Sequence, residues 1–170
     1  KQFVIRAAAK FGFLGRFNKD LGMSPFERFQ VGDAGLSNQF ALLGFDIIAH
    51  RGYPVYTSSD PKVNPDNGSN VQQYFSIFNK YTMELRYPFS TSPTSTIYGL
   101  AFFEAANGWY DFKTYNPFKL RRSAGVGMRF FLPMFGLLGF DYGIGFDRYT
   151  PTSGLKGAAK FTVMLGQEPQ

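Results

Sequence analysis

The most regular feature of the chain is an alternation of apolar and polar residues with a period of two, which predicts β-strands rather than helices. In residues 138–147 every even position is apolar and every odd position is Gly or Asp. Residues 121–132 alternate in the same way, with Val126, Met128 and Phe130 on the apolar side. A turn from Pro133 to Gly136 joins the two segments. The pattern therefore predicts an antiparallel hairpin.

Four further segments show a weaker form of this alternation, namely residues 3–13, 80–87, 96–107 and 160–165. In residues 96–107 the alternation is blurred, because the apolar residues Tyr98, Leu100 and Phe102 share a face with Glu104. Together the six segments predict an all-β fold. The predicted connections are short at 88–95 and 133–136 and longer at 109–119 and 149–157, and residues 15–78 form a long loop after the first strand.

Short turns at one end of the strands and long loops at the other are typical of an antiparallel transmembrane β-barrel. One face of the predicted strands is rich in Phe and Tyr, and the other holds Gly, Asp, Arg and Ser, as expected for lipid outside and a polar lumen inside. A soluble, half-buried sheet produces the same alternation, so the pattern alone leaves that alternative open. Membrane barrels need at least about eight strands to close. We therefore expect these six strands to be part of a larger barrel.

Residues 121–143 resemble the C-terminal signature of BamA and its relatives, the outer-membrane protein insertases of the BamA/TamA superfamily. The sequence of residues 135–141 is similar to that of the Bacteroidota branch of this family. The resemblance implies that residues 1–170 form the last six strands of a sixteen-stranded barrel, integral to the bacterial outer membrane. The first strands and the periplasmic domains would then lie outside this chain, and residues 15–78 would be an extracellular loop that enters the lumen. The hairpin residues that carry the resemblance are Gly125, Gly127, Arg129, Pro133, Gly136, Asp141 and Gly143.

A second match lies in the long loop, where Arg51, Gly52 and Tyr53 resemble the (V/I)-R-G-(F/Y) motif of the same family. Residues 25–29 and 31–33 are similar to the start of that loop. The resemblance implies that Arg51 meets acidic residues on the following strands, which by position are Glu84 and Glu104. The alternation independently puts both carboxylates on polar faces, and one guanidinium can bridge two carboxylates. The simpler alternatives are a solvated Arg51 and a Glu84 that pairs with a neighbouring basic residue.

The last predicted strand resembles the terminal strand of the family, which forms a weak seam with the first strand of the barrel. By resemblance, the chain folds client barrels into the outer membrane by adding client strands to this edge. Its partners would be client outer-membrane β-barrel proteins, accessory lipoproteins, and outer-membrane lipid and lipopolysaccharide. The chain departs from many such barrels by ending on residues 167–170 instead of an aromatic residue. The residues of the seam strand are Lys160, Phe161, Thr162, Val163, Met164, Leu165 and Gly166.

Enzyme chemistry finds little support in the sequence. The chain has no Cys and a single His, His50, with no G-x-S-x-G motif beside it. Asp141 and Asp147 would lie about 20 Å apart on one strand, too far for a pair of catalytic carboxylates. The G-x-G doublets lack the third Gly of a phosphate loop, and such glycines instead leave space for something packed inside. We therefore predict no enzyme, no metal and no cofactor.

The net charge of +6 does not point to nucleic acid, because the basic residues are dispersed along the chain. Two alternatives to an insertase remain. One is a related outer-membrane pore that transports or secretes polypeptides, and the other is a soluble lipid-binding β-barrel.

Overall fold

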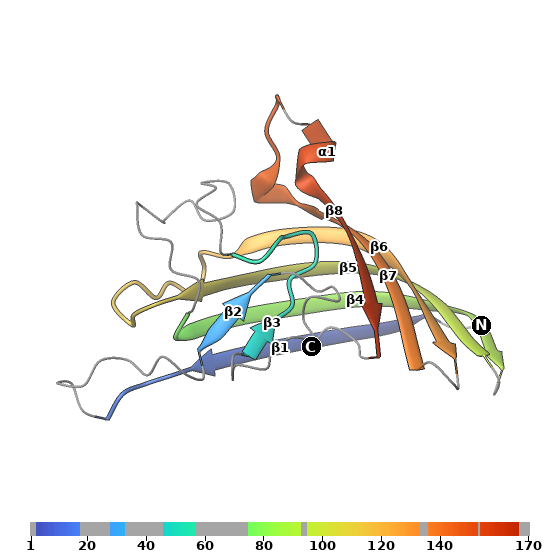
Figure 1. The fold of residues 1–170 in the computed structure, drawn as a ribbon, viewed down its shortest axis with the longest axis horizontal. Helices are drawn as coiled ribbons and strands as arrows, with labels where there is room; N and C mark the ends of the chain where they lie inside the picture. The colour runs from blue at the N-terminus through green and yellow to red at the C-terminus, as the bar shows by residue number, and fades with distance from the viewer. Residues whose placement is uncertain are drawn as a thin grey trace.

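The computed structural model describes residues 3–17, 28–32, 46–56, 75–92, 95–132, 136–152 and 154–166. Its main element is one curved antiparallel sheet of six strands in the order β1-β4-β5-β6-β7-β8 (Figure 1). Within the described residues the sheet is open, since β1 and β8 each pair with one strand. The predicted all-β fold is confirmed as part of a β-barrel wall. The strands are β1 (Val4–Phe13), β4 (Ile77–Ser92), β5 (Ser95–Trp109), β6 (Arg121–Leu132), β7 (Gly136–Gly145) and β8 (Ala159–Leu165).

Strands β4 and β5 are longer than the sequence predicts. β4 begins at Ile77 and continues past Pro88 to Ser92, because a register shift between Pro88 and Ser90 lets the ladder with β5 resume. The prediction of a turn over residues 88–95 was therefore wrong, and the two strands still pair at Ser92 and Ser95.

The alternation predicted from the sequence separates the two faces of the sheet. On β4 the side chain of Glu84 is buried, whereas that of Met83 is 58% exposed. On β7 Asp141 is buried and Tyr142 is 47% exposed. An apolar face of this extent is rare on a soluble monomer and fits contact with lipid. Other exposed side chains of this outer face are Leu85, Phe103, Val126, Met128 and Phe161.

Part of the long loop packs on the inner face of the sheet. Two short strands, β2 (Phe29–Val31) and β3 (Asp46–Ile48), form a separate parallel pair that the sequence did not predict. β2 contacts β4 and β5, and Figure 1 shows the pair lying across the sheet. The pair contributes to a buried hydrophobic cluster between the loop and the sheet. The members of this cluster are Val31, Ile48, Tyr53, Tyr56, Phe75, Phe78 and Ala106.

The connection from β7 to β8 projects beyond the sheet (Figure 1). It contains a short 3-10 helix, η2 (Phe146–Arg148), and a short α-helix, α1 (Gly154–Ala158), neither of which was predicted. The predicted strand over residues 138–147 is corrected accordingly, because β7 ends at Gly145 and Asp147 lies in η2. In the described parts of the chain, no helix is long and apolar enough to cross a membrane.

Several predicted features lie outside the described residues. These are Pro133 of the signature hairpin, residues 25–27 and 33 of the loop start, and the chain end at 167–170.

Candidate functional site on the inner wall

Arg51 is at the centre of the site. We call residues 46–56 the docked loop, because they pack on the inner face of the sheet. The Arg51 side chain is 1% exposed, and its Nε and Nη2 donate to Oε1 of Glu104 on β5 at 3.0 and 2.8 Å. Nη2 also donates to Oε1 of Glu84 on β4 at 2.6 Å, and the backbone N–H of Arg51 donates to Oε2 of Glu104 at 2.8 Å. One loop residue thus joins two neighbouring strands.

Arg51 also reaches residues that were not predicted as its partners. Its guanidinium carbon lies 3.8 Å from the centre of the Phe102 ring, a cation–π arrangement. This contact explains the blurred alternation on β5, since the inward-facing Phe102 is covered by the loop instead of a polar lumen. Nη1 lies 3.8 Å from Oδ2 of Asp141 on β7. Arg129 on β6 binds the same carboxylate through two bonds of 2.8 and 2.9 Å.

The two glutamates have further basic neighbours. Arg86 donates to Oε2 of Glu84 at 2.9 and 2.6 Å, and Nη1 of Arg6 lies 3.7 Å from the same oxygen. Nζ of Lys80 lies 3.5 Å from Oε1 of Glu104. Glu84 therefore pairs with its neighbour Arg86 and with Arg51 at the same time. The buried charges form one network across the wall, where breaking any pair leaves an uncompensated charge.

Glycines on β7 provide the space that the docked loop occupies. A Cβ on Gly143 would lie 2.8 Å from the backbone N of Gly52, and one on Gly145 would lie 2.8 Å from Cζ of Tyr53. Gly52 itself has φ +86°, a conformation that glycine adopts without strain. The prediction that the second G-x-G doublet leaves space for something packed inside is confirmed. On β6, Gly125 leaves space for the Phe102 ring in the same way.

Tyr53 fastens the loop to the β7–β8 connection. Its hydroxyl donates to Oδ2 of Asp147 at 2.7 Å, and it lies 3.1 Å from the carbonyl oxygen of Arg122. Oδ2 of Asp147 also accepts the backbone N–H of Arg122 at 3.0 Å. Burial and the hydrogen bond to Asp147 raise the pKa of Tyr53, so the hydroxyl remains a donor. Sequence reasoning missed this contact, whose residues lie 94 positions apart.

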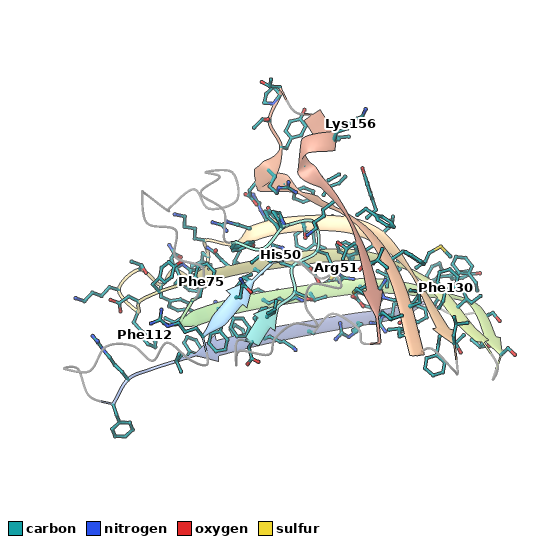
Figure 2. The ribbon with its side chains drawn as sticks, in the orientation of Figure 1. His50, Arg51, Phe75, Phe112, Phe130 and Lys156 are labelled. Atoms are coloured by element: carbon teal, nitrogen blue, oxygen red, sulfur yellow. The ribbon has the colours of Figure 1, made fainter. Side chains whose placement is uncertain are left out.

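His50 is fully buried, and it lies next to Arg51 on the docked loop (Figure 2). Its Nδ1 lies 2.6 Å from the hydroxyl of Tyr56, and its ring stacks on Tyr53 at 4.5 Å. Burial lowers the pKa of His50 to about 3, against the opposing effect of Glu104, and Lys80, Arg121 and Arg51 lower it further. The imidazole is therefore neutral near pH 7 and serves to pack the loop.

We expect docking of the loop to weaken as the pH falls below about 6.5, the ordinary pKa of a histidine. A released loop takes up a proton on His50 below this pH, whereas the docked loop does not until about pH 3. Docking is thus strongest above pH 6.5 and loses about 1.4 kcal/mol per pH unit below it. Hydrogen exchange of the loop amides between about pH 5 and 7 measures the effect after correction for intrinsic rates. His50→Gln, which does not titrate, should flatten the profile, and an unchanged profile would contradict this assignment.

The edge strand β8 contains residues 160–165 of the predicted seam, and Gly166 follows the strand directly. Phe161 and Leu165 point outward and are exposed, whereas Thr162 and Met164 are buried on the inner face. Among the described residues, β8 pairs with β7 alone. The backbone N–H of Gly166 donates to the carbonyl of Leu137 at 2.7 Å and closes this ladder.

Among the described residues, no group of three or more His, Cys, Asp or Glu side chains is placed so that it could hold a metal ion. A curved antiparallel wall with an apolar outer face and a charged loop fastened inside is the architecture of an outer-membrane β-barrel with an internal loop. The Omp85 superfamily domain matches residues 1–168, and the chain belongs to this superfamily. Its members insert or transport outer-membrane proteins and are not enzymes. No curated protein and no solved structure gave a significant match to the chain.

Proposed function

We propose that this chain is the C-terminal portion of the barrel of a BamA-type insertase of the Bacteroidota kind. It would fold and insert client β-barrel proteins into the bacterial outer membrane as the central subunit of an assembly complex. Accessory lipoproteins, outer-membrane lipid and lipopolysaccharide would be its other partners. The mechanism is non-covalent and involves neither a cofactor nor nucleic acid.

The observation that carries this proposal is the combination of a short edge strand with a fastened inner wall. β8 has seven residues, whereas β4 has 16 and β5 has 15. An edge strand presents backbone N–H and C=O groups that a client strand can pair with. In lipid such groups have no water to bind, so pairing with a client strand is strongly favoured.

The docked loop would keep the rest of the wall in place while the edge exchanges partners. Arg51 bonds to Glu84 on β4 and Glu104 on β5, and lies beside Asp141 on β7. These contacts hold three strands of the wall in fixed register relative to the loop. A wall that keeps its shape confines strand exchange to the edge.

The test is Arg51→Ala in the full-length protein. We expect a several-fold fall in the level of folded client barrels in the outer membrane, measured by heat-modifiable migration, because the substitution leaves Glu84 and Glu104 without their shared partner. Arg122→Ala is the matched control, since the side chain of Arg122 is exposed and only its backbone atoms take part in the site. Unchanged client levels in Arg51→Ala would contradict the bracing role.

A second measurement separates an insertase from a transport pore. Full-length protein reconstituted in liposomes should accelerate the folding of a client barrel added in urea. Ion conductance without any acceleration of client folding would overturn the insertase proposal and favour the pore.

A further inference from the structure

Arg148 joins the docked loop to the start of the edge strand. Its Nη1 donates to the carbonyl oxygen of Gly52 at 3.0 Å and to that of Ala158 at 3.3 Å. Gly52 belongs to the docked loop, and Ala158 is the last residue of α1, directly before β8. We call this pair of hydrogen bonds the Arg148 bridge. Nothing in the resemblance or in the sequence pattern singled out this residue.

The loop also contacts the other end of β8. Met164, near the end of the strand, packs against Ala49 of the docked loop, and both are almost fully buried. The inner face of β8 is therefore held near its first residue by Arg148 and near its last residues by Ala49. Between these two contacts the backbone of the strand pairs with β7, its one strand neighbour among the described residues.

Neighbouring bonds fix the position of Arg148. The preceding residue, Asp147, accepts the hydroxyl of Tyr53 and the backbone N–H of Arg122. η2 is thereby attached to the loop on one side and to β6 on the other. The side chain of Arg148 extends from this anchored turn to Gly52 and Ala158. A shift of the docked loop therefore moves the Gly52 carbonyl oxygen that accepts the hydrogen bond of Arg148.

We propose that Arg148 is a positioning residue that couples docking of the loop to the pairing of β8 with β7. While the loop is docked, the bridge holds Ala158 and the first residues of β8 in register. When the loop leaves the wall, the bridge and the contact at Met164 are lost together, and β8 is no longer held as an ordered edge for a client strand. The consequence for clients rests on the proposed insertase function, whereas the coupling itself does not.

Hydrogen–deuterium exchange of the full-length protein in detergent, without client, tests the coupling. In Arg148→Ala we expect the amides of β8 to exchange roughly tenfold faster, as for loss of a hydrogen bond from a charged donor, with no change in β5 and β6. Arg148→Lys keeps a cationic donor and should restore part of the protection. Arg122→Ala removes a nearby arginine without touching the bridge and should leave β8 unchanged.

A double substitution distinguishes coupling from a local structural role. If Arg148 acts on β8 through the docked loop, then Arg51→Ala alone should already speed exchange in β8. Adding Arg148→Ala to it should then have little further effect. Independent, additive effects, no change in β8, or equal acceleration over all strands would each overturn the proposal. Coupled exchange in a protein that does not accelerate client folding would instead overturn the insertase function and leave the bridge intact.

Discussion

Replacing Glu104 with alanine is expected to release the docked loop from the wall. Glu104 accepts bonds from the backbone N, Nε and Nη2 of Arg51, and it lies within ion-pair distance of Lys80. All three side chains are almost fully buried. Removing the carboxylate leaves two buried cations with one fewer counter-charge, which typically costs about 3–5 kcal/mol. The loop can avoid this cost only by leaving the wall.

Limited trypsin digestion measures the release directly. The peptide bond after Arg51 is protected while the loop is docked, because Arg51 is 1% exposed. In Glu104→Ala this bond should be cleaved, and mass spectrometry identifies the new end at Gly52. Asp111→Ala is the matched control, because Asp111 is an exposed carboxylate on the connection after β5. Equal protection of the Arg51–Gly52 bond in wild type and Glu104→Ala would contradict the role given to Glu104.

The presence of the six strands could be predicted from the sequence, because a strand with one face in lipid and the other toward the lumen alternates apolar and polar residues. The bounds of a strand could not be predicted where both of its faces are buried. Residues 77–80 at the start of β4 are all buried, so no alternation marks them. Asn79 there bonds to the hydroxyl of Tyr115 from the β5–β6 connection, a contact that no local pattern encodes.

The candidate site was predictable only in part, for a related reason. A resemblance of short motifs suggested Arg51, Glu84 and Glu104, and the alternation agreed with it. The pairing of Arg129 with Asp141 could have been found from the register of the predicted hairpin, since both lie on its polar face. Asp147 and Arg148 were out of reach, because their loop partners lie 94 and 96 residues away. Contacts of that range depend on how the loop folds back.

Gly143→Ala is expected to prevent docking without breaking the strand. The new Cβ would lie 2.8 Å from the N atom and 3.0 Å from the Cα atom of Gly52. These are backbone atoms, which cannot move aside as a side chain can, and overpacking of this kind commonly costs about 1–3 kcal/mol. The β7 ladder itself tolerates alanine. We therefore expect cleavage after Arg51 and a loss of client assembly similar in size to that of Arg51→Ala.

Gly139→Ala is the control, because it lies on the same strand and faces the same side. Its nearest neighbours would be Cδ of Arg129 and Cε of Met164, both at 3.0 Å and both on flexible side chains. This substitution should leave the Arg51–Gly52 bond protected. If Gly139→Ala released the loop as readily as Gly143→Ala, the close backbone contact at Gly52 would not be what selects glycine at position 143. If the Arg51–Gly52 bond stayed protected in both variants, the ion pairs of Arg51 would be strong enough to keep the loop docked despite the clash at Gly52.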